Sequence, residues 1–301
     1  MLYTAHFGAA VLGCYLVAWA MFRSRWPVHS PSIAILCWQG LGLAIGLAVI
    51  GVPVSLGLAP YDAPPGTAMV MLARDLAGGQ LPRELGLGHL ALISVGLGIG
   101  AVLLGSTVAS LHAAVRARQR QRDLLALVAR PDPAAPGVLV LDHPSAAAYC
   151  VPGLRPRVVI SAGALSLLPR DELAAVLSHE EAHAKERHDL VLLPFTALSR
   201  ALPGVTWVTR ALATVALLVE MRADDRARRR HDDALLAAAL ARFATAPSHA
   251  TPAGMLGAAE HDIVARVRRL RAPSSPTPYR AVLALGAALF LAYMPISLFL
   301  S

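Results

Sequence analysis

The residues with the clearest capacity for chemistry lie between positions 177 and 183, where the chain reads Leu-Ser-His-Glu-Glu-Ala-His. His179 and His183 are four residues apart, so on a helix they share one face and can reach a single tetrahedral metal ion. Glu180 lies beside them and is suited to act as general base on a metal-activated water. The spacing therefore predicts one zinc ion per chain and hydrolytic chemistry.

A catalytic zinc site needs a third protein ligand and leaves its fourth position to water. A histidine six residues beyond the second one is excluded, because Asp189 stands there and no glycine intervenes. The other source is a carboxylate on a second helix, and Glu220 can supply it. Glu186 is the competing candidate. Glu220 is preferred, because consecutive turns of one straight helix do not easily surround an ion.

Further polar residues are candidates for supporting roles. Asp224, one turn after Glu220, can accept a hydrogen bond from a ligand imidazole and fix its tautomer, with Asp225 as its alternate. His188 is five residues past His183, about 140° around a continuous helix, so it is not expected to bind the same ion. It either orients substrate or packs. His188 and Arg226 are the candidates for substrate or oxyanion contacts.

The zinc helix is expected to begin near Pro169 and to end at about Arg187, after a small sheet. Three short runs have β character: 137–141, 146–150 and 157–161. The last of these is expected to offer an edge with which a substrate strand pairs. Its edge residues are Val158, Val159, Ile160 and Ser161. The histidines outside any motif are interpreted as structural, namely His143, His231, His249 and His261.

Composition indicates an integral membrane protein. Of the 301 residues, 56% are hydrophobic and only 15% are charged, against roughly 25% charged in ordinary soluble domains. Four apolar runs are long enough to cross a bilayer: 2–22, 32–59, 87–115 and 279–300. The first run has no basic residues ahead of it and no small-residue cleavage site, so a retained anchor is expected rather than a removed signal peptide.

The basic residues predict the orientation. Clusters of arginines follow the first apolar run, follow the third and precede the fourth. If all four runs cross the bilayer, these three clusters lie on the same side of the membrane. The loop 60–86 has only two arginines, offset by three acidic residues. The segment 116–278 is therefore predicted to face the cytoplasm. The net charge of +8 is assigned to topology and lipid headgroups rather than to direct nucleic-acid binding, since no recognition module is present.

The apolar stretch 190–219 could be taken for a fifth crossing, but Arg200, Pro203-Gly204 and Arg210 interrupt it. A single crossing would also separate Glu220 from His179 by the width of the bilayer. Two buried or membrane-dipping helices in a hairpin are predicted instead, and whether they enter the membrane stays open.

These residues resemble the integral-membrane zinc metallopeptidases of the β-lactam sensor-transducer type and, more distantly, the heat-shock and CAAX prenyl membrane proteases. The resemblance covers about residues 116–270. It rests on an ordered set of motifs: Ala148-Tyr-Cys-Val-Pro-Gly153, Val158-Val-Ile-Ser161, Glu172–His183, Arg187-His-Asp189, Glu220 with Ala223-Asp224, and Arg266-Val-Arg-Arg-Leu270.

The resemblance implies a gluzincin-like domain with His179, His183 and Glu220 as ligands and Glu180 as base. In such relatives the fourth helix leads to a large extracellular sensor domain, whereas this chain stops at Ser301. Direct sensing of an antibiotic by such a domain is therefore not expected. The candidate partners are the lipid bilayer and a protein or peptide substrate, such as a transcriptional repressor or a membrane protein, in regulatory signalling.

The sequence thus predicts a mainly α membrane protein of a bacterial cell membrane. Its parts are three transmembrane helices (1–115), a cytoplasmic α+β zinc peptidase domain (116–278) and a fourth transmembrane helix (279–301). An intramembrane protease is disfavoured, because charged residues follow the motif directly. A non-enzymatic transducer with a structural zinc would not need Glu180. A membrane scaffold or transporter subunit with a chance motif is the remaining alternative.

Overall fold

The computed structural model describes all residues except 1, 81, 132–137, 152–156, 246–255 and 273–278. The described chain is mainly helical, carries one small sheet and forms two compact units. The first unit comprises residues 1–109, 194–211 and 277–301, and the second comprises 110–193 and 212–276.

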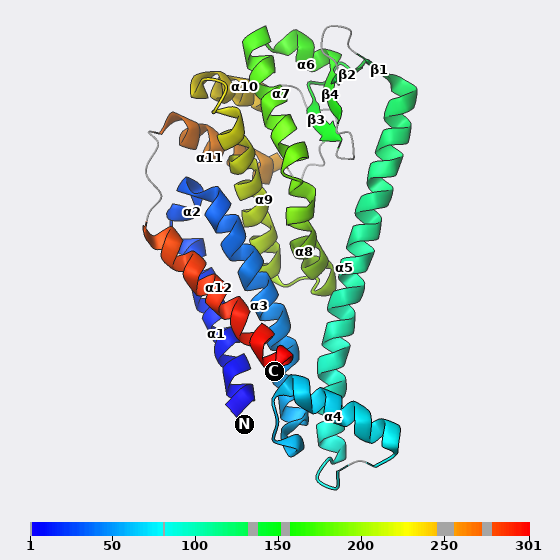
Figure 1. Ribbon diagram of the computed structural model, residues 1–301. Helices are drawn as coiled ribbons and strands as arrows, with labels where there is room; N and C mark the ends of the chain where they lie inside the picture. The colour runs from blue at the N-terminus through cyan, green and yellow to red at the C-terminus, as the bar shows by residue number, and fades with distance from the viewer. Residues whose placement is uncertain (1, 81, 132–137, 152–156, 246–255, 273–278) are drawn as a thin grey trace. The chain divides into compact units, whose positions relative to one another are not determined.

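Long apolar helices form most of the first unit. Its elements are α1 (Leu2–Arg23), α2 (Trp26–His29), α3 (Pro31–Gly57), the 3₁₀ turn η1 (Ala59–Tyr61), α4 (Pro65–Gly78), the first part of α5 (Leu87–Val128) and α12 (Tyr279–Leu300). Helices α1, α3 and α12 lie side by side (Figure 1). The rings of Phe7 and Phe299 are 5.3 Å apart, and a side chain at Gly51 would overlap the ring of Phe7. A small residue thus lets α1 approach α3 closely, as in membrane helix pairs.

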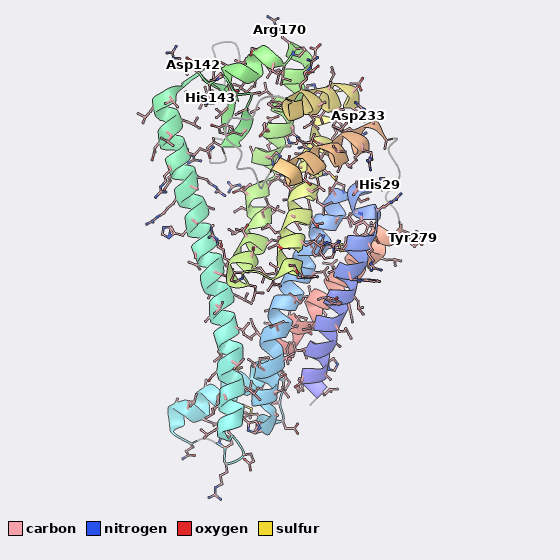
Figure 2. The ribbon with its side chains drawn as sticks, turned by 180° about the vertical axis from the view of Figure 1, so that it is seen from behind. His29, Asp142, His143, Arg170, Asp233 and Tyr279 are labelled. Carbon is pink, nitrogen blue, oxygen red and sulfur yellow. The ribbon has the colours of Figure 1, made fainter. Side chains whose placement is uncertain are left out.

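Four helices among the described residues are long and apolar enough to cross a membrane: α1, α3, α5 and α12. They contain the four apolar runs that the sequence predicted, except that α3 ends two residues before the predicted run 32–59 does. Large apolar side chains on them are exposed, for example Leu104 at 67% and Phe290 at 63%. Soluble proteins rarely leave such extended apolar surfaces in water. These features indicate a membrane protein. Tyr279, at the start of α12, points away from its neighbouring helices (Figure 2).

The stretch 190–219 forms two helices, α8 (His188–Ala201) and α9 (Thr206–Ala227), as predicted. The turn between them contains Gly204 at φ 80°, a conformation that glycine adopts without strain. Residues 194–211 belong to the first unit, where the ring of Trp207 lies 6.4 Å from those of Phe22 and Trp38.

The second unit contains a four-stranded sheet in the order β1-β2-β4-β3. Its strands are β1 (Ala129–Pro131), β2 (Val138–Leu141), β3 (Ala148–Val151) and β4 (Arg157–Ser161). Strands β2 and β4 are parallel, whereas β1 and β3 pair antiparallel with their neighbours. The sequence predicted β2, β3 and β4 but missed β1, which follows α5 directly.

The predicted substrate edge on β4 is wrong. Val158 and Val159 pair with β2 on one side and with β3 on the other, and Ile160 does the same. Ser161 pairs with Leu141 of β2, and its backbone N–H donates to the carbonyl of Ala147. An interior strand has no edge left for a substrate. Among the described strands, β3 is the edge beside β4.

Helices α6 (Ala162–Leu167), α7 (Arg170–Lys185), α10 (Asp233–Thr245) and α11 (Leu256–Arg271) complete the second unit, together with parts of α5, α8 and α9. Helix α7 has Asp171 and Glu172 in its first turn, where carboxylates suit the helix dipole. Its buried stripe packs α7 against α10 and β3 (Figure 1). One core cluster joins α7, α9, α10 and α11: Ala175, Ala227, Leu236, Ala237 and Leu270.

Helix α7 ends at Lys185, two residues earlier than predicted. Arg187 has φ 50°, a left-handed conformation that interrupts the helix, and α8 begins at His188. The break redirects His188, so the 140° offset expected from a continuous helix does not apply.

Candidate metal centre

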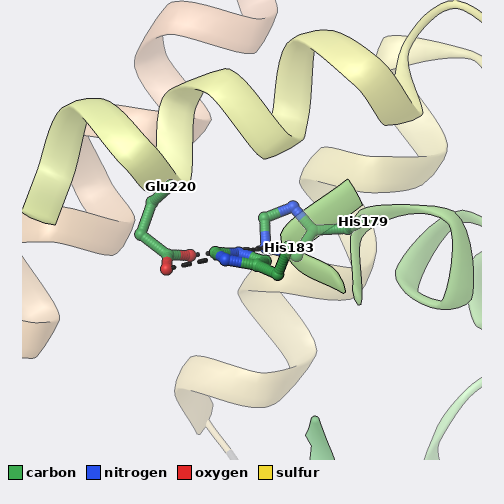
Figure 3. A group of neighbouring side chains, drawn as sticks. All are labelled: His179, His183 and Glu220. Carbon is green, nitrogen blue, oxygen red and sulfur yellow. Dashed lines mark hydrogen bonds and ion pairs between the residues drawn. The ribbon is translucent and has the colours of Figure 1, made fainter. Parts of the chain in front are cut away.

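Three side chains from two helices converge on one point (Figure 3). His179 and His183 lie one turn apart on α7, and their Nε2 atoms are 3.1 Å apart. Glu220 points toward them from α9. Its Oε2 is 3.3 Å from Nε2 of His179, and its Oε1 is 3.4 Å from Nε2 of His183. The structure thus brings together the three residues that the sequence predicted as ligands.

These separations test whether the set fits zinc. In a tetrahedral site with bonds of 2.0–2.1 Å, two donor atoms lie about 3.3 Å apart. The three distances are close to this value, with each imidazole facing a different oxygen of Glu220, and one donor atom from each residue lies within 4.8 Å of the others. Two imidazoles and one carboxylate are also the donor types of catalytic zinc sites. The set therefore fits zinc and leaves a fourth position for water or substrate.

Asp224 holds His179 in the orientation that such a site needs. It is fully buried, and its Oδ1 accepts a bond from Nδ1 of His179 at 2.9 Å. A proton on Nδ1 leaves Nε2 of that ring free to bind a metal. The alternate candidate, Asp225, instead pairs with Arg269 at 2.6 Å. Asp224 is therefore the residue in position to orient His179.

His183 has a different partner. Its Nδ1 lies 3.0 Å from Nδ1 of His188, and Nε2 of His188 lies 3.4 Å from Oε2 of Glu186. Burial and the neighbouring His183 lower the pKa of His188 to about 4, so the ring is neutral at pH 7. A neutral ring can accept from His183 at Nδ1 and donate to Glu186 at Nε2. His188 also lines the cleft described below. The sequence analysis named it as a candidate for a substrate or oxyanion contact.

The competing ligand Glu186 is held elsewhere. Arg222 donates to its two oxygens at 2.9 and 3.1 Å, and Arg226 also binds it. Although burial raises the pKa of Glu186, the two arginines lower it to about 2. Arg226 does not line the cleft and faces a separate surface pocket with Glu186. The structure therefore does not place it as an oxyanion contact, because it projects from a different face of α9 than Glu220 does.

Glu180 opens onto the same space as the candidate ligands. A cleft of about 340 Å³ is lined by Tyr149, Glu180, His183, Ala184, His188, Asp189, Leu192, Val219 and Glu220. Glu180 is half-buried and is not one of the three converging donors. Tyr149 brings the edge strand β3 to this cleft. A carboxylate that borders the cleft beside the metal position is placed to exchange protons with a water there.

The carboxylates of Asp224 and Glu220 favour a cation at this point, whereas the charge of Arg266 opposes it. Burial lowers the pKa of His179, but the bonds to Asp224 and Glu220 outweigh it and raise the pKa to about 9. Burial raises the pKa of Glu220, yet His179, His183 and the charge of Arg266 hold it well below its usual range. Glu220 is therefore ionised near neutral pH, as a metal ligand must be.

The sequence did not predict Arg266 as part of the site. It lies on α11, 42 residues after Asp224, and is buried among Glu220, Asp224 and His179. A signal was present, because Arg266 begins the motif Arg266-Val-Arg-Arg-Leu270, on which part of the family resemblance rests.

The histidines interpreted as structural lie apart from the three ligands where they are described. His143 follows β2 (Figure 2), and its Nδ1 accepts from the backbone N–H of Ser145. His231 is 2.7 Å from the hydroxyl of Ser178. His249 and the side chain of His261 lie outside the described residues.

Comparison with known proteins gives one family. Residues 113–249 match the model of Peptidase family M48, whose members are zinc-dependent metallopeptidases. The match covers less than half of the chain, and it includes α7 and the candidate ligands but ends before α11. It supports a metallopeptidase of this family and does not test the narrower resemblance to the sensor-transducer type. No curated protein and no solved structure matches the chain.

Proposed function

We propose that this chain is a membrane-bound zinc-dependent endopeptidase that hydrolyses peptide bonds of a protein substrate. The carrying observation is the convergence of His179, His183 and Glu220, whose donor atoms lie within 4.8 Å of one another, with Glu180 on the same cleft. The M48 match over these residues supports the same reaction class. One zinc ion per chain would be held by the three converging side chains.

Each residue has a defined part in the reaction. When bound, zinc activates a water molecule and polarises the scissile carbonyl. Glu180 takes the proton of the attacking water and delivers it to the leaving nitrogen as the peptide bond breaks. Asp224 and His188 keep the two imidazoles oriented by bonding to their Nδ1 atoms.

The alternative is a non-enzymatic membrane transducer with a structural zinc. Structural zinc sites almost always have four protein ligands in a closed shell. Among the described residues, three side chains converge here, and they border a cleft that also contains Glu180. Both features favour catalysis over a structural role.

The deciding experiment uses the whole chain purified in detergent. Bound zinc is measured by elemental analysis, and cleavage is followed on an unfolded protein and on a peptide library. We expect about one zinc per chain and cleavage that a chelator stops and added zinc restores. Zinc without cleavage of any substrate would favour the transducer. A chain that binds no zinc would refute the proposal.

We further propose that the chain spans a bacterial cell membrane through α1, α3, α5 and α12, with residues 116–278 in the cytoplasm. The four apolar helices and the distribution of arginines support this orientation. A cytoplasmic site would act on a regulatory protein, such as a transcriptional repressor, or on a membrane protein, without binding nucleic acid itself. The peptidase would then serve in regulatory signalling.

Two exposed positions test the orientation. Gln80 follows α4, and the side chain of Arg170 points outward at the start of α7 (Figure 2). Each is changed to cysteine in a chain whose own cysteines are replaced by alanine. A membrane-impermeant maleimide on intact cells is expected to label Gln80→Cys and to label Arg170→Cys only after lysis. The opposite pattern would place the peptidase domain outside.

A further inference from the structure

The guanidinium of Arg266 bridges the two carboxylates of the candidate metal centre. Its Nη1 donates to Oε2 of Glu220 at 3.0 Å. Its Nε and Nη2 donate to the two oxygens of Asp224 at 2.9 and 2.7 Å. Its Nη2 is also 3.4 Å from Nε2 of His179. Arg266 thus contacts two candidate ligands, Glu220 and His179. It also contacts Asp224, which orients His179.

The two carboxylates need such a partner. Glu220 and Asp224 are one turn apart on α9, so their negative charges repel each other, and Asp224 has no contact with water. Arg266 bonds to both carboxylates, and its positive charge offsets their repulsion. A planar guanidinium also fixes the direction of each carboxylate, which a point charge does not.

We propose that Arg266 is a positioning residue of the metal centre, fixing Glu220 directly and His179 through Asp224. This inference rests on the proposed zinc peptidase and extends its site to α11, beyond the residues that match the family. Arg266 does not line the cleft, so it acts through the ligands and not on the substrate. The expected consequence is that zinc affinity depends on a residue that does not bind zinc.

One effect opposes this role, namely the repulsion between the guanidinium of Arg266 and a bound zinc ion. Arg266 carries a positive charge beside the metal position, so its removal would by itself favour zinc. We expect the loss of positioning to prevail, since partners that orient metal ligands typically contribute 10–100-fold to affinity. The sign of the change in zinc affinity therefore decides between the two effects.

Arg269 provides a matched control on the same helix. It lies three residues later, is also mostly buried and also binds α9, through Asp225 at 2.6 Å and the carbonyl of Met221 at 3.2 Å. These two partners, Asp225 and the carbonyl of Met221, differ from the two carboxylates that Arg266 binds. Arg269→Gln thus tests how much the packing of α11 on α9 contributes by itself.

The experiment compares the full-length native chain, Arg266→Gln, Arg266→Lys and Arg269→Gln in detergent. Zinc affinity is measured by competition with a chelator, and the visible spectrum of bound Co²⁺ reports the geometry of the site. We expect Arg266→Gln to weaken zinc at least about tenfold and to shift the Co²⁺ spectrum. Arg269→Gln should keep both properties. Arg266→Lys should lie between, because an ammonium cannot hold both carboxylates in a planar fork.

Several outcomes would overturn the inference. Native zinc affinity in Arg266→Gln would exclude positioning, and tighter zinc would show that charge repulsion prevails. Equal losses in Arg266→Gln and Arg269→Gln would assign the effect to helix packing. If Arg266→Gln does not fold, Arg266→Lys decides alone, and native affinity with a native Co²⁺ spectrum would refute the bridge. Absence of zinc from the native chain would instead refute the proposed function.

Discussion

Replacing Glu180 with glutamine is expected to lower the rate of peptide cleavage by about 10²–10⁴-fold, the usual contribution of a general base. Glutamine has nearly the same shape but cannot take a proton from the attacking water. Zinc content should stay at the native value, because Glu180 is not one of the three converging donors. The measurement is single-turnover cleavage together with elemental analysis of the same sample.

The adjacent Glu181 is the matched control for this change. It lies on the same helix but pairs on the surface with Lys185 at 2.7 Å and Arg230 at 3.1 Å. Glu181→Gln removes the same charge one residue away from the cleft and should cleave at nearly the native rate. If the Glu180 variant retained native activity, or both variants lost it equally, Glu180 would not be the base.

The sequence predicts most of this site because most of it is local. The spacing of His179, Glu180 and His183 determines their arrangement once α7 is a helix, and the buried stripe of α7 makes it one. Glu220 and Asp224 lie about 40 residues later, and only the chemistry of zinc, with its need for a third ligand, pointed to them. Their distances to the imidazoles depend on how α9 packs against α7.

Features that depend on distant pairing could not be predicted in the same way. The composition of β4 indicates a strand, but its position inside the sheet follows from its pairing with both β2 and β3. A strand pattern does not say which strands form the edges. Arg266 likewise depends on α11 packing against α9, which brings it to carboxylates more than 40 positions earlier.

The break after α7 illustrates a third limit. The sequence predicts the end of the zinc helix at about Arg187, but no feature of the sequence demands a left-handed conformation there. The break turns His188 back toward His183. Its place beside a ligand imidazole therefore follows from backbone geometry that residue spacing alone does not reveal.

Replacing Glu220 with glutamine is expected to weaken zinc binding by more than about a hundredfold, a larger effect than typical losses of an orienting partner. Two imidazoles alone do not complete a catalytic zinc site, and a neutral amide is a poor ligand beside ionised carboxylate. Cleavage should be lost together with the metal. The variant should also lose the increase in melting temperature that zinc gives the native chain, because that increase reports binding to the folded state.

The Glu186→Gln variant distinguishes Glu220 from Glu186, the competing candidate for the third ligand. Glu186 directly follows the last residue of α7, and its carboxylate is bound by Arg222 and Arg226. Its loss should leave zinc stoichiometric and reduce affinity only through the weaker support of His188. If Glu186→Gln abolished zinc binding while Glu220→Gln retained it, the third ligand would come from α7's own end. Helix α9 would then serve only to enclose the site, and the role assigned to Arg266 would fail with it.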